Sequence, residues 1–428
     1  MLKNTELIND LFDFLNCSPT AYQATEQIIA RLKKNGFKPL AEKEVWKLKN
    51  GGRYYVSRNQ SSVIAFVIGA KPVTKKGFHL IGAHTDSPSL KLKPYSEKKV
   101  KSYVRIGVEV YGGPIISTWI DRDLSIAGRV MVWKDNQYES MTVDFQEPLA
   151  IIPNAAIHLN RDINSGFEYN KQNHLPVIIN TSASNDENVL VGMLAKKLKV
   201  KPEQIGEYDL YLYDADPARM LGVKKDFFSS GRLDDLAMCH AILTSITDID
   251  TPDSTAVAMF YDNEEIGSMT HMGAASGFLA NILERIAFSE TTNREAFSVA
   301  LANSFFISSD MAHALHPNYT EKHDDSYAPV LNGGPVIKMN ANFRYATTAE
   351  SCAYFEQLCK KAKVPCQKFV GRSDIPSGST IGPTVSSALS IPAVDVGNPM
   401  LAMHSIRETA GIQDHISMIK VFREFYIV

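Results

Sequence analysis

Short apolar runs recur along the chain, and most of them end in polar or charged residues. Residues 78–83 read FHLIGA, and residues 256–261 read AVAMFY. Similar runs cover residues 297–309 and 391–396. Bounded apolar runs with β-compatible side chains predict buried strands. We therefore expect an α/β fold with a central mixed sheet.

Segments with helical spacing occur between these runs. In residues 5–16 the apolar residues fall on one face of a helix. Ser18 and Pro19 predict an N-cap followed by proline at the first position of the next helix. Residues 231–246 turn helical again, with Asp234 in the first turn, where an anion suits the helix dipole. We expect these helices to flank the sheet.

The middle of the chain has a different pattern. Residues 95–180 alternate apolar and polar positions, as in VRIGVEVYGG and SIAGRVMVW, which predicts a series of strands. We interpret residues 95–231 as an inserted β-rich domain that serves in oligomerisation or as a lid. Residues 1–94 and 232–428 would then form one discontinuous catalytic domain.

Composition and charge narrow the classes of function. The chain has 428 residues, of which 44% are hydrophobic and 21% are charged, and its net charge is −2. These values are typical of a soluble globular protein and argue against a nucleic-acid binder. We find no secretory signal and no apolar run long enough to span a membrane. We therefore expect a cytoplasmic protein with neither a nucleic-acid nor a membrane partner.

The cysteines give no sign of a disulfide framework or a thiolate zinc site. There are five of them, an odd number, and they form no CxxC pair. We interpret them as reduced thiols. Cys352, Cys359 and Cys366 recur every seven residues, which predicts that they share one face of a helix and pack in the core.

Residues that can bind metals follow several of the predicted strands. His84 and Asp310 come directly after strands, Glu264 and Glu265 follow another, and His404 follows the last one after a short loop. In open α/β sheets, ligands bind at the carboxyl ends of the strands. Together with Asp234, these carboxylates and imidazoles suit two divalent ions. Zinc or cobalt fits this mixture of ligands better than magnesium, and manganese is also possible.

Each of these residues also has an ordinary structural interpretation. A histidine after a strand is commonly a satisfied core residue, and two glutamates can form a plain acidic turn. In the functional interpretation, Asp86 lies on the same face of the strand as His84 and orients its ring without binding the metal itself. One glutamate of the pair binds metal, while the other stays available to move a proton.

The motifs, taken in order, resemble the aspartyl aminopeptidase family of dinuclear zinc exopeptidases. The resemblance runs from Phe14 to the C-terminus. It rests on these stretches: FLNCSPTAY, HLIGAHTDSPSLKLKP, IPNAAIHLNRD, GRLDDL, FYDNEEIGS, SSDMAHALHPNY, GPVIKMNANFRYATT and MHSIRE.

The resemblance implies a role for each matching residue. His84, Asp234 and Asp310 would hold one zinc, and Asp234 would bridge to a second zinc held by Glu265 and His404. Glu264 would be the general base that activates the water between the two ions, and Asp86 would steady His84. The positions that would bind substrate are His158, His313, Lys338 and Tyr345.

The family also implies an assembly and a substrate class. Its members combine a zinc-peptidase α/β domain with a smaller β-rich domain and assemble as tetrahedral dodecamers, in which the residue that matches His158 reaches a neighbouring subunit's active site. The substrates are peptides with a free N-terminus, and Lys338 would pair with an N-terminal Asp or Glu side chain. The competing interpretation of Lys338 is a surface salt bridge. Residues 334–348 alternate, which places Lys338 and Tyr345 on a strand or at its ends.

One position departs from the family pattern, and more than one function is compatible with the motifs. Asp235 stands where the family often has Asn, which could alter the charge near the metals. Relatives that cleave neutral N-terminal residues leave the acidic preference open. A two-zinc carboxypeptidase or N-deacylase would share the HxD motif and the glutamate pair. A non-catalytic protein that keeps the fold is a third interpretation.

Overall fold

The computed structural model describes residues 4–181, 188–291 and 293–428, which form two compact units. The first unit contains the described residues up to Asp86, together with Ala218–Met403 and Glu408–Val428. The second unit contains Ser87–Pro217 and His404–Arg407. A loop is predicted over residues 181–188, most of which lie outside the described residues.

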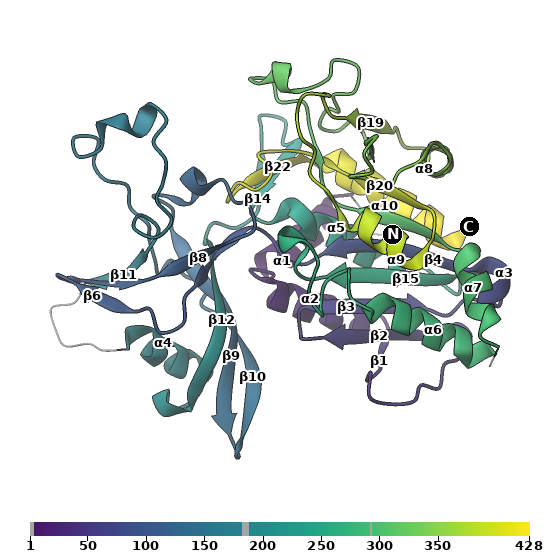
Figure 1. The fold of residues 1–428 in the computed structure, drawn as a ribbon, viewed down its shortest axis with the longest axis horizontal. Coiled ribbons are helices and arrows are strands. Elements are labelled where there is room, and N and C mark those ends of the chain that lie inside the picture. Colours follow the sequence, from purple (N-terminus) through teal and green to yellow (C-terminus); the bar gives the residue numbers. More distant parts are fainter. Residues whose placement is uncertain (1–3, 182–187, 292) are drawn as a thin grey trace. The chain divides into compact units, whose positions relative to one another are not determined.

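A nine-stranded mixed sheet forms the centre of the first unit (Figure 1). Its strands, in spatial order, are β1 (Lys38–Pro39), β2 (Arg53–Arg58), β3 (Ser62–Val67), β15 (Thr255–Tyr261), β4 (Phe78–His84), β16 (Phe305–Ser309), β20 (Ala393–Gly397), β18 (Val336–Met339) and β19 (Gln367–Val370). The strands β15, β4, β16 and β20 run parallel to one another. Their carboxyl ends therefore meet at one edge of the sheet.

Helices cover both faces of this sheet. The described α-helices of the unit are α1 (Asn4–Asn16), α2 (Ala21–Lys34), α3 (Val73–Lys76), α5 (Leu233–Thr247), α6 (Phe278–Glu290), α7 (Glu295–Ala302), α8 (Ala349–Lys361), α9 (Ile381–Leu389) and α10 (Ile412–Ile427). Apolar residues of α1, α2, α5, α8 and α10 form one buried core with one face of the sheet. Residues of α6 and α9 form a second core with the other face. The mixed α/β fold predicted from the sequence is confirmed.

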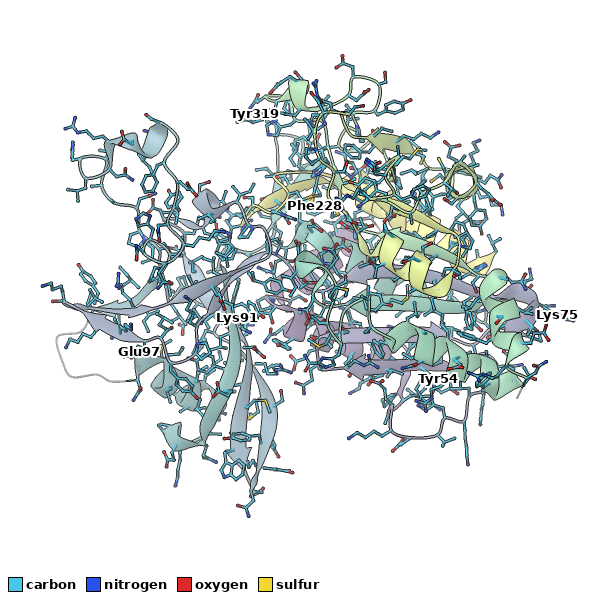
Figure 2. The ribbon with its side chains drawn as sticks, viewed as in Figure 1. Tyr54, Lys75, Lys91, Glu97, Phe228 and Tyr319 are labelled. Atoms are coloured by element: carbon cyan, nitrogen blue, oxygen red, sulfur yellow. The ribbon has the colours of Figure 1, made fainter. Side chains whose placement is uncertain are left out.

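A smaller sheet completes the first unit. It consists, in order, of β13 (Arg219–Leu221), β14 (Phe227–Ser230), β22 (Glu408–Gly411), β21 (Pro399–Leu401) and β17 (Ala312–His313). Phe228 of β14 is buried in the main core, whereas Tyr319, in the loop after β17, is exposed (Figure 2).

The second unit is rich in antiparallel strands. One sheet contains β10 (Gln137–Asp144), β9 (Leu124–Lys134), β12 (Ile205–Asp214), β5 (Ser89–Leu92) and β8 (Val108–Tyr111), and the other contains β11 (Val177–Thr181), β7 (Tyr103–Ile106) and β6 (Lys98–Val100). An α-helix of this unit, α4 (Val189–Leu198), receives an N-terminal cap from a residue distant in sequence. The Glu97 carboxylate (Figure 2) accepts the backbone N–H groups of Val189 and Leu190 at 2.8 and 2.9 Å.

Three local predictions are wrong, each for a physical reason. Residues 297–309 do not form one strand, because 297–302 belong to α7, whose buried Ala296 and Ala300 have helical spacing. The N-cap of α2 is Thr20, whose hydroxyl accepts the N–H of Tyr22 at 3.3 Å. Tyr345 lies outside β18, which ends at Met339, because the chain turns after Asn340, whose carbonyl accepts the N–H of Phe343 at 3.1 Å.

The three cysteines also do not share one helix. Cys352 and Cys359 lie on α8, but the helix ends at Lys361, before Cys366. All five cysteines of the chain are free thiols. None of the helices in the described part of the chain combines the length and apolar character needed to cross a bilayer.

Candidate metal centre

Three parallel neighbouring strands bring the predicted residues to one edge of the sheet. β4 lies between β15 and β16 and ends at His84. Asp310 follows β16 directly, and Glu264 and Glu265 follow β15 in a single turn of 3₁₀-helix, Glu264–Ile266. Because parallel strands present their carboxyl ends on the same side, residues far apart in sequence become neighbours here.

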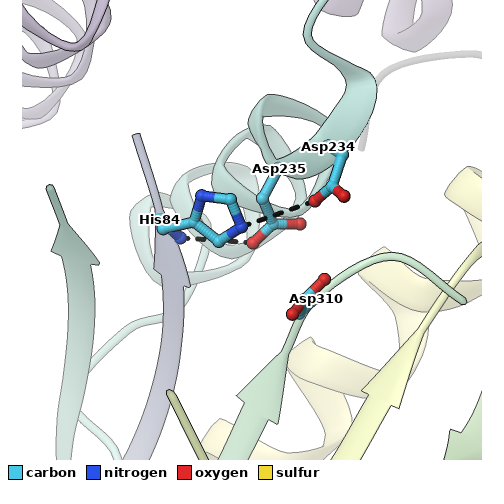
Figure 3. Close-up of side chains that lie close together, drawn as sticks. All are labelled: His84, Asp234, Asp235 and Asp310. Carbon is cyan, nitrogen blue, oxygen red and sulfur yellow. Dashed lines mark hydrogen bonds and ion pairs between the residues drawn. The ribbon is translucent and has the colours of Figure 1, made fainter. Parts of the chain in front are cut away.

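The start of α5 supplies two more carboxylates. Asp234 Oδ1 lies 3.4 Å from His84 Nε2, and Asp235 Oδ2 accepts the backbone N–H of His84 at 3.2 Å (Figure 3). The backbone at Asp234 is not helical, with φ −83° and ψ 103°, so its placement does not depend on the helical first turn that the sequence predicts. The backbone N–H of Asp234 donates a hydrogen bond to Glu408 Oε2 at 3.1 Å.

Asp86 connects the histidine with the glutamate pair. Its two carboxylate oxygens accept the backbone N–H groups of Glu264 and Glu265, each at 3.1 Å. Its Oδ1 lies 3.4 Å from His84 Nδ1, which also lies 3.0 Å from the Asp86 carbonyl oxygen. The sequence predicted that Asp86 orients His84, on the assumption that both lie in one extended strand. The strand β4 ends at His84, however, and Asp86 lies beyond it.

The ligand atoms of these residues are close enough to surround a metal ion. His84, Asp234, Asp235 and Asp310 each offer one donor atom within 4.8 Å of the others, and His84, Glu264 and Glu265 form a second such group. All four members of the first group are buried. Asp235 Oδ1 is buried and accepts no hydrogen bond within the described residues. Carboxylates with an imidazole are suitable zinc ligands, so the residues fit a divalent metal.

The crowding of buried carboxyls shifts their pKa values upward. Burial raises the pKa of Glu264 to about 8 and that of Asp310 to about 6, and neighbouring carboxylates add to both shifts. The pKa values of Asp235 and Glu265 are also well above their ordinary range, for the same reasons. Burial lowers the pKa of His84, but the hydrogen bond to Asp234 and the charges around it outweigh burial and raise it. A divalent cation would offset the repulsion between these carboxylates, which adds to the effect of burial.

A lysine and a tyrosine lie behind Asp310. Lys338 is only 3% exposed, its Nζ lies 3.7 Å from Asp310 Oδ1, and it donates a hydrogen bond to the Met311 carbonyl at 3.1 Å. The same Nζ lies 5.3 Å from the centre of the Tyr345 ring. This burial excludes the competing interpretation of a surface salt bridge.

A pocket of about 290 Å³ opens beside these residues. Tyr345 and His313 both line it, together with Phe369 and residues of β21. The rings of His313 and Phe369 meet edge to face, with centroids 5.8 Å apart. Two of the predicted substrate-binding residues therefore lie in one cavity.

His404 and His158 belong to the second compact unit, so their assignment to the site remains a prediction. His404 Nδ1 lies 3.1 Å from the carbonyl oxygen of Gly113, in the same unit. Because a carbonyl only accepts hydrogen bonds, the proton is on Nδ1 and the lone pair is on Nε2, as a metal ligand requires. His158 is exposed in the loop between β10 and β11.

Two residues that the structure places here had no predicted role. Asp235 was noted only as a departure from the family pattern, yet it is a member of the buried donor group. Glu408, the last residue of MHSIRE, orients Asp234 through its backbone. The sequence did contain a signal for Asp235, because it stands next to the predicted ligand Asp234. The sequence contained no signal for Glu408 beyond its position in the motif MHSIRE.

Comparison with known proteins identifies the family. The sequence profile described as "Aminopeptidase I zinc metalloprotease (M18)" matches residues 14–426. The chain belongs to the M18 family of zinc aminopeptidases. This M18 protein is therefore a zinc-dependent aminopeptidase, a hydrolase, and the resemblance found in the sequence is confirmed.

Individual M18 relatives agree over the whole length. The chain is 46% identical over 432 residues to a probable M18 family aminopeptidase 2 of Clostridium novyi, covering 100% of both proteins. It is 45% identical over 425 residues to the protein of that name from Ectopseudomonas mendocina, covering 98% of both.

Solved structures show the same fold. A structure of the Ape4 and Nbr1 complex matches with a TM-score of 0.96 and 38% identity, covering 99% of this chain and 86% of the other. The S. cerevisiae mApe1 dodecamer matches with a TM-score of 0.86 and 30% identity, covering 98% and 95%.

Proposed function

We propose that this M18 protein removes N-terminal residues from peptides, with a preference for Asp and Glu, and that it uses two divalent ions held at the edge of the central sheet. His84, Asp234 and Asp310 would hold one ion. Asp234, Glu265 and His404 would hold the other. The two groups of close metal-ligand atoms that share His84 are the observation that carries this proposal.

The bound ions, zinc in the first place, would polarise the scissile carbonyl and lower the pKa of the attacking water. Glu264 accepts the proton of that water and later delivers it to the departing amine. The Glu264 N–H donates a hydrogen bond to Asp86 Oδ1 at 3.1 Å, which holds the backbone that carries this carboxylate. Asp86 also keeps the His84 ring oriented.

The preference for acidic residues rests on Lys338. The pocket lined by His313 and Tyr345 would accept the N-terminal side chain, and the Lys338 ammonium, next to Tyr345, would attract its carboxylate. Lys338 already faces Asp310, so it would have to serve both carboxylates. Part of the contribution of Lys338 to activity would then come from holding the Asp310 carboxylate in place.

The assembly is proposed by similarity. The mApe1 relative is a dodecamer, and we propose the same assembly for this chain, with the β-rich residues 95–231 in a role of oligomerisation or lid. The exposed His158 would then reach the active site of a neighbouring copy. Gel filtration with light scattering measures the assembly directly.

The experiment that tests the function compares release rates from matched Asp-, Glu-, Leu- and Lys-chromogenic amides, with and without chelator. Chelator-sensitive cleavage that favours Asp and Glu supports the whole proposal. Cleavage of Leu amides at an equal rate keeps the mechanism and overturns the specificity. Cleavage of N-blocked peptides in place of free ones would contradict an aminopeptidase, because such an enzyme needs the free amine.

A further inference from the structure

Asp395 is a buried aspartate to which the proposed mechanism gives no role. It lies in the middle of β20 and is fully buried. β18 pairs antiparallel with β20, and Lys338 stands directly opposite Asp395 in this pairing. Residues opposite each other in an antiparallel pair project their side chains from the same face of the sheet. Asp395 therefore shares a face with the lysine on which the proposed specificity rests.

The Asp395 carboxylate accepts hydrogen bonds from two segments that are distant in sequence. Its Oδ2 accepts the backbone N–H of Ala346 at 2.6 Å, and its Oδ1 accepts the Thr380 hydroxyl at 2.5 Å. The backbone N–H of Asp395 donates in turn to the Thr347 hydroxyl at 2.9 Å. β20 thus holds residues 345–347 at two points and residues 377–380 at one.

Both segments belong to the wall of the proposed substrate pocket. Tyr345 lines the pocket from the first segment, and Ser377 lines it from the second. The segments also bind each other directly, because the Ser379 hydroxyl donates to the Arg344 carbonyl at 3.1 Å. Asp395 therefore joins two parts of the pocket wall to the central sheet.

Close packing fixes the position of the Asp395 carboxylate. A Cβ added at Gly382, in the first turn of α9, would collide with both of its oxygens. The N-terminal end of a helix also stabilises a nearby anion. Burial raises the pKa of Asp395, and the Lys338 ammonium is the strongest of the influences that oppose this rise.

We propose that Asp395 is a positioning residue for the peptidase reaction, which holds the segments of Tyr345 and Ser377 so that the pocket is formed before substrate binds. The proposal rests on the proposed function, which assigns this pocket to the N-terminal side chain of the substrate. A site that is formed only part of the time binds its ligand more weakly by that fraction. Because bound substrate orders the segments, loss of Asp395 should raise KM and change kcat little.

The test compares Asp395→Ala with the wild type, both as full-length, zinc-loaded protein. Alanine leaves the Ala346 N–H and the Thr380 hydroxyl without their acceptor. KM for the amide that the wild type cleaves best should rise about 10-fold, as when only about a tenth of the molecules have a formed pocket. Asp395→Asn keeps an acceptor oxygen for Ala346 and should stay close to the wild-type KM. A lower kcat at wild-type KM in Asp395→Ala would show a merely structural role and overturn the proposal.

Hydrogen–deuterium exchange measures the two segments without substrate. Peptides that cover residues 343–348 and 377–382 should exchange faster in Asp395→Ala than in the wild type, and equal exchange in both proteins would overturn the proposal. If the wild type cleaves no amide, the proposed function fails, and the exchange rates still decide whether Asp395 holds the two segments.

Asp414→Ala is the matched control, because Asp414 is also fully buried and accepts two backbone N–H groups, those of Asn332 and Gly334, at 2.6 and 2.7 Å. It should lower the melting temperature and leave KM unchanged. An equal rise of KM in this control would contradict a specific role of Asp395. Thr380→Val, which removes one hydrogen bond to Asp395, serves if Asp395→Ala does not fold. It should raise both KM and exchange, and wild-type values of both would overturn the proposal.

Discussion

Asp86 holds the backbone of Glu264: its Oδ1 accepts the Glu264 N–H at 3.1 Å. The other oxygen accepts the N–H of Glu265, and the same carboxylate faces His84. One side chain thus connects a proposed metal ligand, a second ligand and the proposed general base. His84 ends β4, whereas Glu264 and Glu265 lie in the 3₁₀ turn that follows β15.

Asp86→Asn should weaken metal binding by about 10–100-fold, the usual effect of losing a partner behind a metal ligand. In the Asn variant one of the two oxygens becomes an NH2 group, which donates hydrogen bonds and would face the N–H of Glu264 or Glu265. Titration with a zinc buffer would measure the affinity. Asp144→Asn, which changes an aspartate of the second unit, is a control. Equal zinc affinity in Asp86→Asn and wild type would contradict this role.

Glu264→Gln should lower turnover by about 10²–10⁴-fold, because the amide cannot accept the proton of the attacking water. Metal content should stay unchanged, since other residues are the proposed ligands. Turnover is measured with the Asp amide, and bound zinc by elemental analysis. Glu147→Gln, at an exposed position, should behave as wild type. Wild-type turnover in Glu264→Gln would remove Glu264 from the mechanism.

Lys338→Met should lower kcat/KM for the Asp amide by about 10–100-fold more than for the Leu amide, the range for a lost hydrogen bond to a charged group. Lys368→Met is the matched control, because Lys368 is exposed and paired with Glu356 at 2.8 Å. If the rates for both amides fall equally, Lys338 acts by holding Asp310 and does not select the substrate.

Removal of metal should abolish activity and lower the melting temperature. Without a cation, the carboxyls around Asp234 repel one another; burial first, and then this repulsion, raises the pKa values of Asp235 and Glu265. Zinc at about 1,000 times its Kd should add about 4 kcal/mol to the free energy of unfolding. Thermal scans of chelated and reloaded protein measure the change. An identical melting temperature in both forms would mean that this cluster does not bind the ion.

Stability should fall as the pH falls below 6.5, in part because of His415. Burial, followed by the charge of His240, lowers the pKa of His415 well below its ordinary value of 6.5. Below that pH the unfolded chain takes up a proton that the native state does not, so acid favours unfolding. Each such proton costs up to about 1.4 kcal/mol per pH unit.

His415→Leu should therefore make the dependence of unfolding free energy on pH shallower between pH 5 and 6.5. Denaturant unfolding at several pH values measures the slope, which is independent of any constant loss of stability. The control His271→Leu removes an exposed histidine. An unchanged slope in His415→Leu would show that His415 does not titrate differently in the two states.

The order of apolar runs and their polar ends predicted much of this site. His84, Asp310 and the pair Glu264 and Glu265 were located because each follows a short run that had to be a buried strand. The division of residues 297–309 into α7 and β16 was missed, because an apolar run by itself does not distinguish a buried helix from a strand. The family motifs added roles that periodicity could not supply.

By itself, the sequence identified the candidate metal ligands and the candidate general base, and it predicted that they lie at the ends of strands, since both are local properties of the chain. Only the tertiary structure decided that β15, β4 and β16 are neighbours and that Asp86 binds the backbone of Glu264. It also decided that Asp235 joins the buried group of metal-ligand atoms around His84. Strand order and backbone hydrogen bonds depend on packing between distant segments, which no local pattern of side chains encodes.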